Sequence, residues 1–177
     1  LAGSKDRVRI VQFHPSYAYE DFVEGYRPQV VNEQPGFGLV EGPLRRMARD
    51  AAHAPNVTHV LIIDEINRGN VAKVFGELYF LLEYRDEEMQ LQYSAKPMSL
   101  PKNLWIIGTM NTADRSIALV DAALRRRFYF IPFFPGEPPI KGVLRRWLNA
   151  MRPECAWVAD VVDRANALID DRHGAIG

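Results

Sequence analysis

Apolar residues gather in short continuous runs that predict buried strands. The clearest runs lie at 8–13, 58–63, 104–109 and 128–133, and each has the length of an ordinary strand. The run at 58–63 is apolar almost throughout, which is typical of a strand covered on both faces in a parallel sheet. The stretches between the runs include helical spacing, so the pattern predicts an α/β fold whose parallel sheet is flanked by helices.

Helical spacing is clearest at 70–84, where apolar residues recur at every third or fourth position. Asn70 stands where it can cap the first turn, so we expect one continuous helix. The other expected elements are a turn of helix at 19–26, a loop or small hairpin at 28–42, helices at 44–54 and 117–127, and a hairpin within 85–103.

Four prolines between residues 132 and 139 end this alternation, and only helical patterns follow, at 143–151 and 157–170. An α/β layer followed by helices alone indicates two parts. We expect an α/β core at 1–134 and part of a helical lid subdomain at 135–177.

Composition narrows the class of protein. The 177 residues carry 22 basic and 22 acidic side chains, so the net charge is zero and no bulk attraction to DNA or an anionic membrane is expected. The single cysteine, Cys155, excludes a disulfide framework and a cysteine-based zinc site and fits a reducing compartment. The longest aliphatic run, 60–63, is far short of the ~20 residues that cross a bilayer, and residues 1–9 lack the apolar core of a secretory signal. We expect a soluble, cytoplasmic protein with no membrane segment.

Two adjacent carboxylates, Asp64 and Glu65, follow the apolar run at 60–63. Ligands of open α/β sheets bind at the carboxyl ends of the strands. In phosphate-loop nucleoside triphosphatases, the first carboxylate there belongs to the Mg²⁺ site and the second orients or deprotonates the attacking water. Alternatively, the two residues only begin a loop and cap the next helix.

Polar residues also follow the run at 104–109, among them Asn111 and Asp114. An asparagine at a strand end can hydrogen-bond a γ-phosphate or a lytic water without adding charge. The alternative is a local turn in which Asp114 or Ser116 caps the helix that follows.

Three consecutive arginines, Arg125, Arg126 and Arg127, end the helix expected at 117–127. Basic residues suit the dipole at a helix C-terminus, which accounts for one or two of them. Three in a row cover nearly a full turn and cannot all share one partner. At least one can therefore reach the phosphate of a neighbouring molecule as an arginine finger.

Four segments in this order, 13–28, 62–78, 107–116 and 123–128, resemble McrB-type AAA+ proteins. These are the GTP-hydrolysing motor subunits of restriction systems specific for modified cytosine. The resemblance covers roughly 8–177 and implies an AAA+ core followed by the start of a helical lid. It also implies Mg²⁺ with GTP or ATP as cofactors, a homo-oligomeric ring, expected to be a hexamer, and an McrC-like nuclease subunit as partner. DNA would be bound through a domain absent from this sequence.

The resemblance also implies roles for single residues. Asp64 would belong to the Mg²⁺ site, Glu65 would be the catalytic base, and Asn111 would be the sensor that places the lytic water. Asp114 would support the signature loop at 107–116. Arg126, with Arg127 as the second choice, would be the arginine finger that acts on the nucleotide of the adjacent subunit. Arg68 would lie at a subunit interface or, alternatively, form a local ion pair.

The family's phosphate-binding loop, a glycine-rich turn ending in Gly-Lys-Ser or Gly-Lys-Thr, does not occur in the 177 residues. Gly3, Ser4 and Lys5 do not replace it, because no apolar strand precedes them. We therefore expect an excerpt that lacks this loop and the strand before it and is inactive alone. That strand would lie between 104–109 and 128–133, so these two runs should not pair directly.

Two other functions remain open. An AAA+ relative of the MoxR or dynein-related kind, an ATP-driven remodelling chaperone, shares the run from Asp64 to Arg68. A non-catalytic interaction module would have the same fold, but it need not keep Asp64, Glu65, Asn111 and the arginines. The segment 110–116 favours the McrB type.

Overall fold

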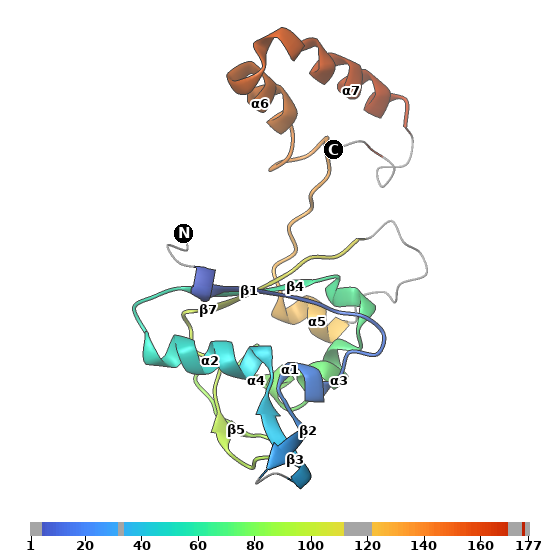
Figure 1. The fold of residues 1–177 in the computed structure, drawn as a ribbon. Coiled ribbons are helices and arrows are strands. Elements are labelled where there is room, and N and C mark those ends of the chain that lie inside the picture. The colour runs from blue at the N-terminus through green and yellow to red at the C-terminus, as the bar shows by residue number, and fades with distance from the viewer. Residues whose placement is uncertain (1–4, 32–33, 112–121, 170–174, 176–177) are drawn as a thin grey trace. The chain divides into compact units, whose positions relative to one another are not determined.

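The computed structural model describes residues 5–31, 34–111, 122–169 and 175 (Figure 1). The chain divides into two compact units. The first contains the described residues up to 111 together with 122–127, and the second contains the described residues from 128 onwards. Within the described residues, no helix combines the length and the apolar character that crossing a bilayer requires.

The first unit is built on a three-stranded parallel sheet. Its strands are β1 (Val8–Gln12), β4 (His59–Asp64) and β7 (Leu104–Gly108), in the order β1-β4-β7. Three of the four runs predicted as strands are therefore strands, and the parallel sheet is confirmed. Because the strands are parallel, their carboxyl ends lie along one edge of the sheet.

Helix α2 (Pro43–His53), which matches the predicted helix at 44–54, packs on one face of this sheet. Leu61 and Ile63 of β4 are fully buried on that side. The opposite face carries Ile10 and Trp105, which are 67% and 60% exposed. The sequence predicted that both faces of the sheet are covered. In the described part of the chain, only one face is covered.

Residues 128–133 form no strand, so this prediction is wrong. Their apolar side chains are exposed, with Tyr129 at 101% and Phe133 at 69%. The physical reason is that a strand needs a neighbour, and the described part of their own unit holds helices and no strand. The sequence predicted that 104–109 and 128–133 do not pair directly. Among the described residues β7 pairs only with β4, so no pairing with 128–133 is seen.

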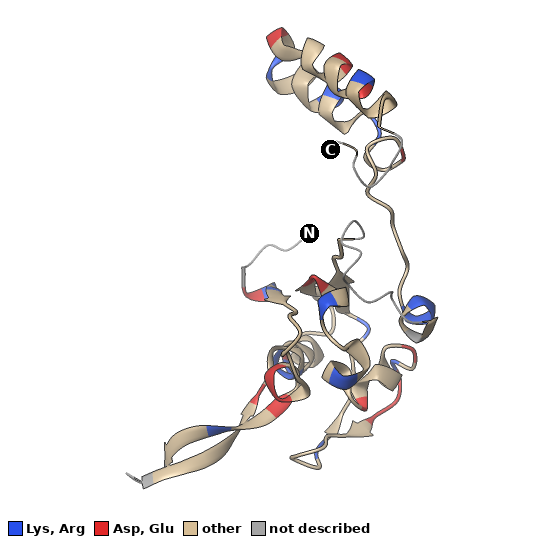
Figure 2. Ribbon diagram, turned by 90° about the vertical axis from the view of Figure 1, so that its right-hand side faces the viewer, with Lys and Arg blue, Asp and Glu red and all other residues tan. Residues whose placement is uncertain are grey.

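Strands β2 (Glu24–Val31) and β3 (Gln34–Glu41) form an antiparallel hairpin. The sequence predicted a loop or small hairpin at 28–42. The observed hairpin starts earlier, at residue 24, and is longer than predicted. The cross-strand pair Tyr26 and Leu39 and the pair Pro28 and Phe37 put apolar side chains opposite each other, which offsets the weak strand propensity of proline and glycine. Figure 2 shows this hairpin projecting from the unit with few charged residues along it.

A buried carboxylate fixes the base of this hairpin. Glu24 is fully buried and accepts hydrogen bonds from the backbone N–H groups of Tyr93, at 3.0 Å, and Ser94, at 2.8 Å. It also forms an ion pair with Arg45 of α2. The amides lie between the short strands β5 (Met89–Gln90) and β6 (Pro97–Met98), the hairpin predicted within 85–103. Glu24 therefore joins the two hairpins.

The predicted helix at 70–84 is divided into α3 (Val71–Phe75) and α4 (Leu78–Leu81). Asn70 caps α3 as expected, because its Oδ1 accepts a hydrogen bond from the Lys73 N–H at 3.0 Å. One continuous helix is nevertheless wrong, since Gly76 has a φ of +55°. A side chain at Gly76 would come within 2.9 Å of the ring of Tyr19, and this close approach favours glycine at the break.

Gly76→Ala should destabilise the protein by about 1–3 kcal/mol, because alanine at φ 55° and ψ −133° meets its own backbone and here also the ring of Tyr19. Chemical denaturation of the full-length protein would measure this. Gly136→Ala is the matched control, since nothing lies within 4 Å of the methyl group that it adds. Equal stability of both variants would contradict the account of the helix break.

The remaining helices of the first unit are α1 (Tyr19–Phe22), which is the turn of helix predicted at 19–26, and α5 (Ala122–Arg127). The second unit holds α6 (Val143–Met151) and α7 (Trp157–Ala167), both at the positions predicted. Arg145 of α6 ties the two helices together by ion pairs with Asp160, at 2.7 Å, and Asp163, at 2.8 Å.

Candidate active site

Polar side chains meet where the three parallel strands end. Asp64 is the last residue of β4, and both of its carboxylate oxygens accept hydrogen bonds. Gln12, the last residue of β1, donates from Nε2 to Oδ2 at 3.2 Å. Thr109, directly after β7, donates from its hydroxyl to Oδ1 at 2.6 Å. The carboxylate predicted for this edge therefore lies there, and a neighbour from each side orients it.

Glu65 makes the turn between β4 and a 3₁₀ helix at Ile66–Arg68 in a left-handed backbone conformation, with φ 56° and ψ 44°. Such a conformation costs a non-glycine residue roughly 1–2 kcal/mol and is found preferentially at functional sites. Two hydrogen bonds to Thr109 hold this turn. The Glu65 N–H donates to the Thr109 hydroxyl at 3.3 Å, and the Ile66 N–H donates to the Thr109 carbonyl at 2.9 Å.

The Glu65 side chain is paired with Arg68, whose Nε lies 3.1 Å from Oε2. The alignment is that of an ion pair and not of a hydrogen bond, since the buried Oε2 accepts no hydrogen bond from the part of the chain that the structure describes. Arg68 thus makes the local ion pair that the sequence left as an alternative, and nearly half of its side chain, 47%, remains exposed.

Asn111, the predicted sensor, lies beside the turn that follows β4. The side chain of Asn67 donates to the Asn111 carbonyl at 3.4 Å, which joins the two segments. Asn111 is exposed. Asp114, the other residue predicted from this segment, lies outside the described residues. The structure therefore brings Asp64, Glu65 and Asn111 to one edge of the sheet.

The three arginines at the end of α5 differ in their surroundings. Arg127 is only 17% exposed, forms an ion pair with Glu83 at 3.2 Å, and places its guanidinium 4.6 Å from the centre of the Tyr79 ring. Arg125 and Arg126 are exposed. Arg127 therefore contributes to packing within its own unit, which leaves the two exposed arginines as the better candidates for contact with another molecule.

The oxygen ligands at the strand ends suit Mg²⁺ better than a metal ion whose ligands all come from protein side chains. Among the described residues, no group of three or more His, Cys, Asp or Glu side chains is placed to hold a metal ion. Proteins usually hold Mg²⁺ through one or two carboxylates, with water and substrate phosphates completing the octahedron. Asp64, which lies at an open edge beside a threonine hydroxyl, meets that requirement.

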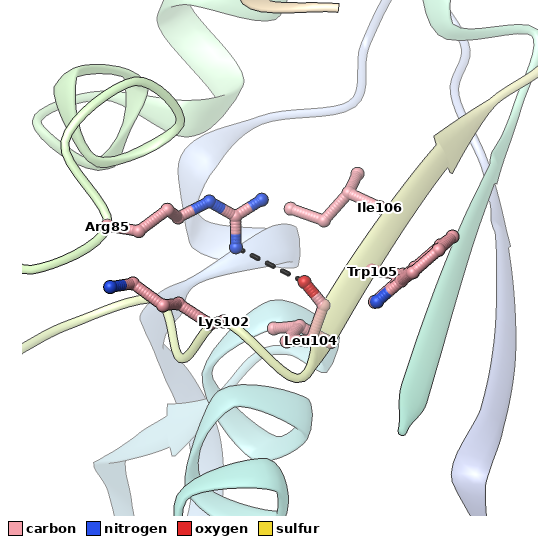
Figure 3. A pocket seen from close by; sticks show the side chains of 5 residues that line it. All are labelled: Arg85, Lys102, Leu104, Trp105 and Ile106. Carbon is pink, nitrogen blue, oxygen red and sulfur yellow. Dashed lines mark hydrogen bonds between the residues drawn. The ribbon is translucent and has the colours of Figure 1, made fainter.

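A shallow pocket of about 310 Å³ lies at the other end of β7 (Figure 3). Its lining includes Arg85, Lys102 and Trp105. Arg85 donates to the carbonyl of Leu104 at 3.2 Å, and burial lowers the pKa of its guanidinium. Leu104 begins the strand whose far end leads to Thr109, so this pocket is separate from the cluster of carboxylates.

Sequence reasoning missed Gln12 and Thr109. Gln12 is the next-to-last residue of the predicted strand 8–13 and Thr109 is the last residue of the predicted strand 104–109, and the side chains at the ends of neighbouring parallel strands meet. The position of each residue therefore carried a signal, although a hydrogen bond to Asp64 could not be read from it.

Residues 2–128 match the model of a protein family described as the AAA domain, dynein-related subfamily. The type IV methyl-directed restriction enzyme EcoKMcrB subunit of Escherichia coli K12 is 43% identical over an alignment of 177 positions, which covers 95% of this chain and 37% of that protein. The component YdiS of the type II restriction enzyme BsuMI of Bacillus subtilis is 28% identical and covers 68% of this chain and 46% of its own.

A crystal structure of a protein from Cytophaga hutchinsonii aligns with 82% of this chain and 39% of its own, with 16% identity and a TM-score of 0.48. This likeness is too weak to carry an argument. The chain spans less than half the length of both restriction proteins, at 37% and 46%. These comparisons confirm the resemblance stated from the sequence motifs.

Proposed function

This chain belongs to the AAA domain family, in its dynein-related subfamily, and on that premise we propose that it forms the hydrolytic part of a nucleoside triphosphatase that powers modified-DNA restriction. The observation that carries the proposal is the meeting of Asp64, Glu65 and Asn111 at the carboxyl edge of the parallel sheet. The nucleotide is GTP or ATP.

The geometry supports a different role for each of the three residues. Asp64, oriented from both sides, would hold Mg²⁺. When bound, Mg²⁺ would neutralise charge on the phosphate oxygens. Glu65, in the turn directly after β4, would take the proton of the attacking water. Asn111 would orient that water by hydrogen bonding without adding negative charge.

The proposal concerns the full-length protein, because the 177 residues contain no Gly-Lys-Ser or Gly-Lys-Thr loop. Other residues must hold the phosphates. Exposed Arg126 would act on the nucleotide of an adjacent subunit, which requires a homo-oligomeric ring, and we propose a hexamer. An McrC-like nuclease subunit would be the partner, and DNA would be bound by a separate domain.

The remodelling chaperone remains the second candidate, because the matching family model is that of the dynein-related subfamily. The two restriction proteins among the relatives favour the restriction function over it. Hydrolysis of GTP and ATP by the full-length protein, measured with and without Mg²⁺ and with and without the nuclease subunit, tests the proposal. Absence of Mg²⁺-dependent hydrolysis of both nucleotides under all these conditions would overturn it.

Asp64→Asn should weaken Mg²⁺-dependent nucleotide binding by at least about tenfold, because loss of even an outer-shell partner of a metal ligand typically costs 10–100-fold. Titration of the full-length protein with Mg²⁺ at fixed nucleotide measures the effect. Asp86→Asn is the control, since Asp86 is 79% exposed and pairs with Lys102 on the surface. Equal Mg²⁺ dependence of the two variants would remove Asp64 from the metal site.

A further inference from the structure

Thr109 makes four hydrogen bonds that connect the end of β7 to the end of β4. Its N–H donates to the carbonyl of Ile63 at 2.9 Å, and its carbonyl accepts from the Ile66 N–H at 2.9 Å. Its hydroxyl donates to Asp64 at 2.6 Å and accepts from the Glu65 N–H at 3.3 Å. Thr109 therefore contacts the chain at all four consecutive positions from 63 to 66.

The two backbone bonds and the two hydroxyl bonds differ in what they require. The N–H and carbonyl of almost any residue could make the first pair, which continues the pairing of the two strands. The second pair requires a side chain that donates to a carboxylate and accepts from an amide at once. Serine and threonine hydroxyls do both at this short distance from the backbone. The side-chain contacts are thus specific to the residue type.

The hydroxyl acts on the two carboxyl residues in different ways. For Asp64 it fixes the carboxylate itself, together with Gln12 on the opposite oxygen. For Glu65 it fixes the backbone, because the left-handed conformation directs the N–H toward the threonine. Among the described residues, the Glu65 side chain pairs with Arg68, and its direction also depends on this backbone turn.

We propose that Thr109 is a positioning residue of the hydrolytic site, whose hydroxyl sets the Asp64 carboxylate and the Glu65 turn together. This inference rests on the proposed function. Asn111 follows two residues after Thr109 on the same segment, so a displacement of the end of β7 moves Asn111 and, through the hydroxyl, both carboxyl residues. The three groups then keep their relative places when the strand end shifts.

The test uses three forms of the full-length protein: wild type, Thr109→Val and Thr109→Ser. Valine keeps the shape and the two backbone bonds but removes the hydroxyl, whereas serine keeps the hydroxyl. Thr109 is exposed, so neither change should prevent folding. At saturating Mg²⁺, we expect Thr109→Val to lower kcat by about 10–100-fold, the size of effect seen when an outer-shell partner is lost, with the nucleotide KM changed less than about threefold. Thr109→Ser should stay within about threefold of wild type.

Hydrogen exchange resolved to single amides provides a readout that does not depend on activity. The Glu65 N–H should exchange at least about tenfold faster in Thr109→Val and at the wild-type rate in Thr109→Ser. The Ile66 N–H should be unchanged in both, because its acceptor is the Thr109 carbonyl. If wild type hydrolyses neither nucleotide, the proposed function fails, and the Glu65 exchange still decides whether Thr109 holds the turn.

The positioning role would be overturned by either of two kinetic results. One is a kcat for Thr109→Val within about threefold of wild type. The other is a loss in Thr109→Ser as large as that in Thr109→Val, which would mean that the hydroxyl is not the active group. Unchanged exchange of the Glu65 N–H in Thr109→Val would overturn it as well.

Discussion

Glu65→Gln in the full-length protein should slow nucleotide hydrolysis by about 10²–10⁴-fold while nucleotide and Mg²⁺ binding stay nearly intact. The amide has the shape of the carboxylate but cannot take a proton, and this range is the usual contribution of a general base. The structure adds a reason to expect intact binding. Asp64, and not Glu65, receives the hydrogen bonds of Gln12 and Thr109, so the metal site proposed at Asp64 should not depend on the Glu65 charge.

Single-turnover hydrolysis and equilibrium nucleotide binding, measured on the same preparation, separate the two effects. Glu88→Gln is a suitable control, because Glu88 is exposed in the loop that precedes β5. A normal rate of hydrolysis in Glu65→Gln would show that another group takes the proton. A loss of binding as large as the loss of rate would instead give Glu65 a role in holding the nucleotide.

The sheet was predictable because its strands carry short apolar runs. The runs at β1, β4 and β7 were found for this reason, and with them the edge where Asp64 and Asn111 lie. The run at 128–133 has the same composition and is not a strand. An apolar run reports a tendency to be buried, and pairing also requires a neighbouring strand that local sequence does not supply.

Features decided by contacts between distant segments could not be predicted. The break between α3 and α4 depends on the ring of Tyr19 beside Gly76, whereas the apolar spacing continues through the glycine. The left-handed turn at Glu65 depends in the same way on Thr109. Local sequence propensity does not predict either contact, because each contact joins residues far apart in the sequence.

For the three consecutive arginines, the sequence and the structure each contribute a different part of the answer. The sequence indicated that three consecutive arginines cannot share one partner. The structure identifies Arg127 as the one engaged within its own unit, through Glu83 and Tyr79. The finger role therefore fits Arg126 better than Arg127, which the resemblance gave as the second choice. Loss of Arg127 should act through packing instead.

Arg126→Ala should lower turnover of the assembled full-length protein by about 10³–10⁵-fold, the usual contribution of an arginine finger, without unfolding the subunit. The defect should lie in trans, because the finger of one subunit acts on the nucleotide of its neighbour. Mixing Arg126→Ala subunits with Glu65→Gln subunits should restore part of the activity, since some interfaces then join an intact finger to an intact site. Lys102→Ala, which removes a 74% exposed surface cation paired with Asp86, should keep nearly normal turnover. If no mixing ratio restores activity, the triplet has a structural role and the finger must be sought elsewhere.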